Sequence, residues 1–292
     1  MHMKTIKQPS ICRQNGFTMM ELIIVIVLLG IIGAMGAEFI SQAFKGFFDT
    51  DIRMEMYEEG KAALVRMERE IHIAVPNAVK PLYNGIETDT CDETTPCNGI
   101  KFGVIDDNAM AGVFGQYTEA RPTDGATITD RSAPLPATTL ISIYNTTWED
   151  FALTADNRVY SVITPATPPL DPNTMTLDRN IVSASPYGRY YAVRPEAVSF
   201  SVGGGSLLRS TTAVTAGNAL STIFTNQQTL AQNVQPAIDP SKIAPNNKLP
   251  YFTYEPGTST RNSVVSIHFA ISSPNGEETV NFHKEVQIRN VP

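Results

Sequence analysis

The sequence of 292 residues is poor in the side chains that carry most enzyme chemistry. It holds four histidines, His2, His72, His268 and His283, and one tryptophan. None of the histidines belongs to an HExxH pattern, and the chain has no GxSxG motif, P-loop or GxGxxG motif in its required context. These absences argue against an enzyme, a cofactor and a metal centre, and we expect none of the three.

Basic residues are also scarce, and three of them lie at the start of the chain. The formal net charge is −7, and it becomes −10 if Lys4, Lys7 and Arg13 are removed with the first 16 residues. Proteins that bind phosphate backbones need clustered lysine and arginine. We therefore expect no nucleic-acid partner.

Long apolar runs are absent except for one, which covers residues 17–37. A helix of about 21 residues is long enough to cross a ~30 Å hydrocarbon core. The basic residues before the run would keep the N-terminus in the cytoplasm and leave the remainder outside. A secretory signal peptide has a shorter apolar core. An ordinary membrane anchor explains everything except Glu21, because a carboxylate in such a segment is costly and usually has a partner.

The residues around Glu21 resemble a known processing site. The stretch "GFTMMEL" (16–22) is similar to the prepilin cleavage motif of type IV pilin-like proteins, in which a prepilin peptidase cuts after the glycine and methylates the new amine. The resemblance implies removal of residues 1–16, cleavage between Gly16 and Phe17, and N-methylation of Phe17. It also implies that Glu21 meets the Phe17 amine of a neighbouring subunit and sets the register of assembly, since each buried charge then has a partner. A plain signal-anchor that contains this pattern by chance is the alternative.

Beyond the apolar run, the pattern predicts that the helix continues through residues 38–75. This segment contains no proline, and two pairs at i,i+4, Arg66 with Glu70 and Glu68 with His72, are typical of a solvated face. Pro76 should end the helix. Apolar residues recur near helical spacing at Ile52, Met56, Ala63, Met67, Ile71 and Val75.

The remainder, residues 76–292, predicts a β-rich head, and hence an α+β fold in which a long helical spine packs against mostly antiparallel strands. Short β-branched or aromatic runs at 100–105, 139–144, 158–163 and 190–194 are separated by turn residues. Alternating apolar residues at 265–271 and 280–288 flank Asn275-Gly276 and predict a hairpin, with Lys284 breaking the pattern. His268 and His283 lie outside its apolar alternation, so we expect both to face solvent. Residues 203–262 should be irregular, with "GGGS" (203–206) as a loop.

The cysteines divide between the leader and the head. Cys12 would leave with the leader, which makes Cys91 and Cys97 an even pair in the segment "CDETTPC". Outside the cytoplasm, such a pair closes a small disulfide loop. Zinc is the alternative, but no CxxC or HxxxH supplies further ligands. Asn145 begins a weak glycosylation sequon.

Two further stretches narrow the resemblance within the family. "ALVRMEREIHIAVPNAV" (63–79) is similar to the helix end of larger minor pilins and pseudopilins, the PilW type of type IV pili and the GspJ type of type II secretion systems. "HKEVQIRNVP" (283–292) resembles the ending of minor pilins of the mannose-sensitive haemagglutinin (MSHA) pilus, the MshO type.

The resemblance implies a structural subunit that helps to initiate pilus assembly and lies at or near the tip. Its implied partners are the prepilin peptidase, the major pilin, other minor pilins, the inner-membrane assembly platform and, before assembly, the lipid bilayer. It would span the inner membrane once, with the head periplasmic, and later reach the cell surface. A secretion pseudopilin and a ligand-binding or adhesive head are the alternatives. A calcium site would have only Asp92 and Glu93 as nearby carboxylates.

Overall fold

The computed structural model of the chain describes residues 16–92, 95–109, 114–117, 127–129, 135–152, 157–164, 174–242, 247–257 and 261–288. The predicted leader, apart from Gly16, and the last four residues of the MSHA-like ending lie outside them. The chain forms two compact units, residues 1–52 and 53–292, which are described separately.

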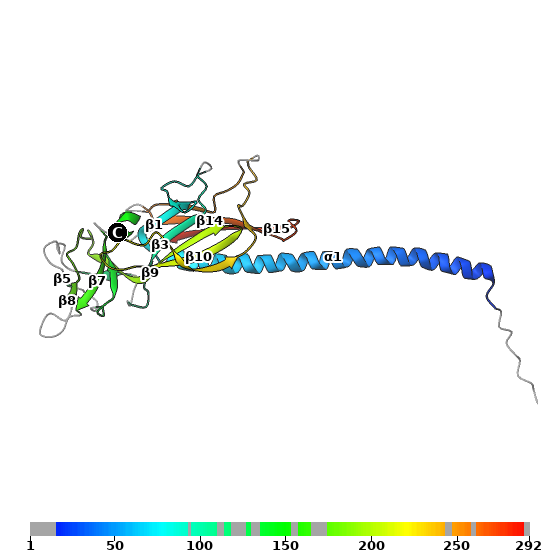
Figure 1. The fold of residues 1–292 in the computed structure, drawn as a ribbon, viewed down its shortest axis with the longest axis horizontal. Helices are drawn as coiled ribbons and strands as arrows, with labels where there is room; N and C mark the ends of the chain where they lie inside the picture. Colours follow the sequence, from blue (N-terminus) through cyan, green and yellow to red (C-terminus); the bar gives the residue numbers. More distant parts are fainter. Residues whose placement is uncertain are drawn as a thin grey trace, which may run out of the picture. The chain divides into compact units, whose positions relative to one another are not determined.

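The described residues form helices and strands that begin with the long helix α1 (Figure 1). The helices are α1 (Met19–His72) and α2 (Trp148–Ala152). The strands are β1 (Ala74–Tyr83), β2 (Ile86–Glu87), β3 (Gly99–Ile105), β4 (Gly115–Gln116), β5 (Thr127–Thr129), β6 (Leu140–Ser142), β7 (Val159–Thr164), β8 (Thr174–Leu177), β9 (Arg189–Gly203), β10 (Ser206–Ala213), β11 (Thr225–Ala231), β12 (Val234–Gln235), β13 (Phe252–Glu255), β14 (Ser263–Ser272) and β15 (Thr279–Ile288). The α+β prediction is therefore confirmed.

The C-terminal part of α1, residues 53–72, packs one face against the head. Met56, Ala63, Met67 and Ile71 are all buried, as their helical spacing predicts. Gly60 is also on this face, and a Cβ placed on it would lie 2.1 Å from Cζ of Phe282 on β15. Only glycine lets the Phe282 ring approach the helix this closely.

Helix α1 ends at His72, three residues before the predicted end at Val75. Val75 and Pro76 already belong to β1, and Ala74 is paired with Val104 of β3. A residue before proline is disfavoured in the helical region, which makes Val75 suited to an extended strand. Pro76 is therefore incompatible with the helix, as predicted, but the helix already ends at His72 and the chain is extended from Ala74.

Two polar pairs predicted for a solvated face of α1 instead make contacts with the head. Glu70 is buried and accepts from Arg66 Nε (3.1 Å) and, with both carboxylate oxygens, from Arg209 Nε on β10 (3.0 and 2.8 Å). Glu68 pairs with Lys284 of β15 at 2.8 Å. The prediction of a solvated face was therefore wrong for Glu70 and only partly right for Arg66 and Glu68, because strands of the head cover this side of the helix. His72 is exposed, as predicted.

The larger sheet is built around β9, and its strand pairs are all antiparallel. Its order is β2-β1-β3-β9-β6-β7-β8-β5, with β10 pairing β9 and β11, and β4 pairing β9. The first half of β9 pairs with β4 and β6, whereas the second half pairs with β3 and β10. The long strand thus joins two hydrophobic clusters, one around Tyr160 and Tyr190 and the other around Phe151 and Val193.

The smaller sheet contains the predicted C-terminal hairpin. Strands β14 and β15 pair from Ser263–Ile288 to Ser272–Thr279, and the turn between them has Gly276 at φ +73°. β12 and β13 pair with the other edge of β14. Lys284 breaks the apolar alternation of β15 because its ammonium binds Glu68 of α1.

The other predicted strands are present, with changed lengths. Residues 100–105 and 158–163 correspond to β3 and β7, whereas β6 covers only Leu140–Ser142 of 139–144 and β9 extends far beyond 190–194. The irregular structure predicted for 203–262 was only partly right. β10 to β13 lie there, whereas the described residues 214–224 and 236–242 belong to no strand, and the predicted GGGS loop is present as a turn. Gly204 and Gly205, with φ of 58° and 75°, form the tight turn between β9 and β10.

Candidate functional site

The predicted processing point lies immediately before α1. Gly16, Phe17 and Thr18 precede the helix, and Phe17 is 78% exposed. Nothing within 4 Å surrounds the position that a Cβ on Gly16 would take. The described residues of this unit therefore leave the Gly16–Phe17 bond exposed.

Thr18 and Glu21 together form the start of the helix. The Glu21 N–H donates to the Thr18 carbonyl at 3.1 Å and to its Oγ1 at 3.3 Å. The T-x-x-E spacing is that of a capping box. Among the described residues the structure shows its first half, in which the Thr18 hydroxyl caps the Glu21 amide. The glutamate also lies where the helix dipole favours negative charge. Sequence reasoning missed this local role, although the spacing itself signals it.

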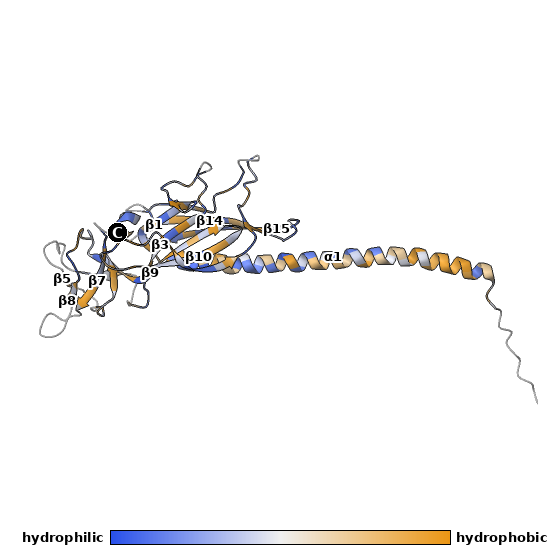
Figure 2. Cartoon of the chain, in the orientation of Figure 1, coloured by the Kyte–Doolittle hydropathy of each residue, from blue (hydrophilic) through white to orange (hydrophobic). Residues whose placement is uncertain are grey.

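The first part of α1 presents its apolar side chains outward over the whole membrane-length run. The window that could cross a membrane has no buried residue in the structure. The apolar colouring of α1 is strongest near its N-terminus (Figure 2). A helix that is apolar on all sides is stable only in a membrane or among other apolar helices.

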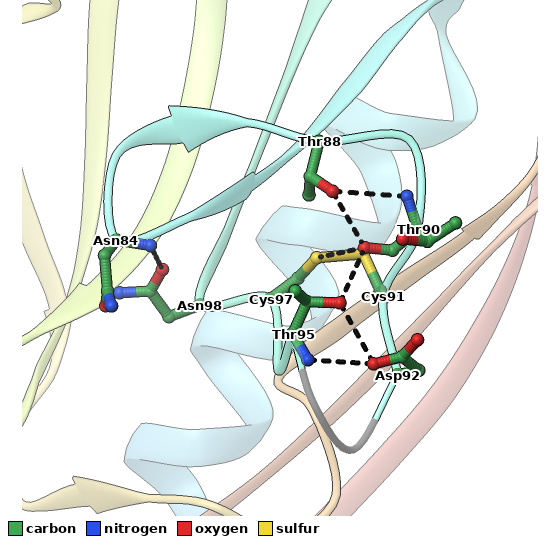
Figure 3. Close-up of a disulfide and its surroundings, with 8 residues drawn as sticks. All are labelled: Asn84, Thr88, Thr90, Cys91, Asp92, Thr95, Cys97 and Asn98. Carbon is green, nitrogen blue, oxygen red and sulfur yellow. Dashed lines mark hydrogen bonds between the residues drawn. A yellow bond between two sulfur atoms is a disulfide. The ribbon is translucent and has the colours of Figure 1, made fainter.

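The predicted disulfide joins Cys91 to Cys97, with the Cα atoms 5.3 Å apart (Figure 3). Asp92 Oδ1 accepts from the Thr95 amide at 2.8 Å and from its hydroxyl at 3.0 Å within the loop. The prediction of a disulfide is confirmed. Asp92, one of the two carboxylates considered for calcium, is occupied by the turn, and Glu93 lies outside the described residues.

Two buried lysines of the larger sheet form a charged cluster that sequence reasoning missed. Lys80 on β1 and Lys101 on β3 are opposite each other in register. Lys80 donates to Asp89 and to Glu149 at 2.7 Å, and Lys101 pairs with Glu87. The Lys101 ammonium also lies 4.9 Å from the Trp148 ring centre. The sequence does carry one signal of this cluster, since Lys101 lies within an otherwise apolar strand.

The electrostatics of this cluster favour paired charges. Burial lowers the pKa of Lys80, but the hydrogen bonds to Asp89 and Glu149 outweigh it and leave that pKa raised. Burial raises the pKa of Glu149, but the hydrogen bond from Lys80, further local hydrogen bonds and the Lys80 charge together leave that pKa lowered. Two clefts of about 170 Å³ each are both lined by Trp148 and Glu149. Both ammonium groups are paired with carboxylates. Through these ion pairs, Lys80 and Lys101 attach α2 and the segment before the disulfide to the sheet.

His268 and His283 stack across β14 and β15, with ring centres 4.5 Å apart. His283 is exposed as predicted, but His268 is half-buried and its Nδ1 has no hydrogen-bond partner among the residues that the structure describes. Burial, followed by the charge of His283, lowers the pKa of His268. The prediction of solvent exposure was therefore right for one histidine and only partly right for the other.

The sequon residue Asn145 is buried, and its amide donates to the Ser142 hydroxyl. Such an amide is not available to a glycosyl transferase in the folded head. The side chain of Asn145 therefore has a packing role.

The comparisons with known proteins support the N-terminal motif and find no similarity for the rest of the chain. Residues 11–37 match the family described as the prokaryotic N-terminal methylation motif. No curated protein and no solved structure is significantly similar to the chain.

The motif, the membrane-length helix and the antiparallel head point to the same general class of protein. They support a type IV pilin-like protein, either a pilin or a pseudopilin, anchored in the inner membrane. A structural role suits this combination better than catalysis, and it is consistent with processing by a prepilin peptidase.

Proposed function

We propose that this chain is a minor pilin of a type IV pilus of the MSHA type. The prepilin peptidase cuts between Gly16 and Phe17 and methylates Phe17, and the mature subunit joins other minor pilins and the major pilin on the inner-membrane assembly platform. It helps to initiate the filament and occupies a position at or near the tip. The observation that carries the proposal is the methylation motif directly joined to an apolar helix.

In the proposed assembly, Glu21 pairs with the Phe17 amine of a neighbouring subunit. Both groups lie at the beginning of α1, so each charge enters the apolar filament core at the same level. An ion removed from water without a partner costs several kcal/mol, which makes subunits in any other register unfavourable. The MSHA assignment comes from the resemblance of the helix end and of residues 283–292.

The proposal is tested by shearing surface filaments from cells and searching them by mass spectrometry. Peptides that begin at methylated Phe17, present in a small and reproducible ratio to the major pilin, are expected. A Gly16 variant that blocks cleavage serves as the control and should leave the filaments without this subunit. Methylated protein confined to the membrane fraction would instead favour a type II secretion pseudopilin.

A further inference from the structure

The segment of α1 that follows the membrane-length run has two unlike faces. Ile40, Phe44, Phe47 and Phe48, here called the phenyl stripe, recur at helical spacing and are 56%, 59%, 67% and 57% exposed. Phe48 contacts both other rings, with centres 6.5 Å from Phe44 and 6.1 Å from Phe47. The stripe is therefore one continuous apolar surface within the first unit of the chain.

The opposite face of the same turns is polar. Glu38, Gln42, Lys45 and Asp49 follow one another at intervals of three and four residues, and all four are exposed. Asp51 then ends the apolar stripe. The amphipathic segment begins directly after residue 37, so the stripe is continuous with the apolar run below it.

The length of the apolar surface exceeds a bilayer core. Within α1, residues 19–37 span about 28 Å of helix, but residues 19–48 span about 45 Å. The hydrocarbon core is about 30 Å thick, and the bilayer with its headgroups about 40–45 Å. An upright helix would lift Phe47 and Phe48 into water. A tilt of about 30° shortens the span along the membrane normal to about 39 Å and lies within the usual range of tilts.

We propose that, before assembly, α1 is tilted in the bilayer and the phenyl stripe lies in the outer headgroup layer. This inference rests on the membrane insertion contained in the proposed function. When the helix tilts, the side that faces the membrane is brought down to the lipid surface. The phenyl stripe gives that side the apolar side chains that contact with lipid requires. The polar face then points to water, and Lys45, at the edge of that face, can extend toward lipid phosphates. The occupant of the stripe is the phospholipid interface.

The experiment measures the depth of single tryptophans by quenching with brominated lipids. Full-length protein is placed in phosphatidylethanolamine and phosphatidylglycerol vesicles whose acyl chains carry bromine at shallow or deep positions. Phe47→Trp reports on the stripe, and Gln42→Trp is the matched control on the polar face. Val27→Trp reports insertion of the apolar run. Native Trp148, in the head, gives the background that is subtracted.

The expected result is that shallow bromines quench Phe47→Trp several-fold more than Gln42→Trp, although Gln42 is five residues nearer the membrane-length run. Deep bromines should quench Val27→Trp most. Equal quenching at positions 42 and 47, or a water-like emission from Phe47→Trp, overturns the stripe proposal while Val27→Trp remains quenched. Loss of quenching at Val27 overturns membrane insertion itself, and with it both proposals.

Discussion

The close approach of the Phe282 ring to Gly60, in the C-terminal part of α1, makes a demanding prediction. A Cβ at this position would lie 2.1, 2.3 and 2.8 Å from three carbons of the Phe282 ring. The ring cannot retreat freely, because it stacks on Phe269 at 4.9 Å and on Tyr57 at 6.2 Å. Gly60→Ala therefore forces a shift in packed aromatic side chains.

The magnitude follows from two opposing effects. Ordinary carbon contacts need about 3.5–4 Å, so the ring and the helix must separate by about 1.5 Å. Overpacking of this kind costs about 1–3 kcal/mol. Replacement of a helical glycine by alanine gains back up to about 1 kcal/mol. We expect a net loss of about 1–2 kcal/mol, which lowers the Tm of a head of this size by several degrees.

The assay is thermal and denaturant unfolding of the detergent-solubilised protein. Gly46→Ala is the matched control, because nothing lies within 4 Å of a Cβ there, and it should cause no loss. Phe282→Leu should relieve part of the clash, so the double variant should be more stable than the sum of the single effects allows. If Gly60→Ala is as stable as the parent protein, the Phe282 ring does not pack against Gly60 as closely as described.

Three other predictions concern the helix start, the disulfide and acid stability. Glu21→Gln and Glu21→Ala should both leave cleavage largely intact and lower incorporation into filaments, measured against the major pilin by mass spectrometry. Replacing Cys91 and Cys97 by serine should cost about 2 kcal/mol of unfolding free energy, because the closed loop is short, and the midpoint in denaturant measures this loss. For His268, the folded pKa lies below the unfolded value of about 6.5, so the unfolded chain binds the proton more tightly. Stability should therefore fall as the pH drops through about 6.5 toward the folded pKa, and His268→Gln should reduce this loss in unfolding measured from pH 7.5 to 5.5.

Each of these has an outcome that contradicts it. Normal incorporation of Glu21→Gln alongside reduced incorporation of Glu21→Ala would assign Glu21 to helix capping, since glutamine preserves the capping box. For the disulfide, the parent protein under reducing conditions should match the serine variant, and an unchanged midpoint in both would refute a stabilising role. An equal pH slope in the parent and His268→Gln proteins would refute the acid prediction.

Local patterns in the sequence were sufficient for much of the chain. The apolar run, the helical spacing of Met56, Ala63, Met67 and Ile71, and the Asn275-Gly276 hairpin all depend on neighbouring residues. Such patterns carry their own physical reason, namely a repeat of 3.6 or 2 and a turn that needs positive φ. The Cys91–Cys97 pairing was predictable because its loop is short and the only other cysteine lies in the leader.

Only the tertiary structure decided which polar residues are buried and which strands use the segment 203–262. Glu70 looks like part of a solvated helix face until Arg209, 139 positions away, is seen to bind it. Lys80 and Lys101 look misplaced in apolar strands until their carboxylate partners are known. Strands β10 and β11 have weak signals of their own. β10 forms because β9 supplies a paired edge, and β11 forms because β10 supplies the next one. The sequence alone determined the helix, the motif and the hairpin. Contacts between distant residues decided which charged side chains are buried and which strands pair, because the free energy of burying a charge or pairing a strand depends on partners that no local pattern contains.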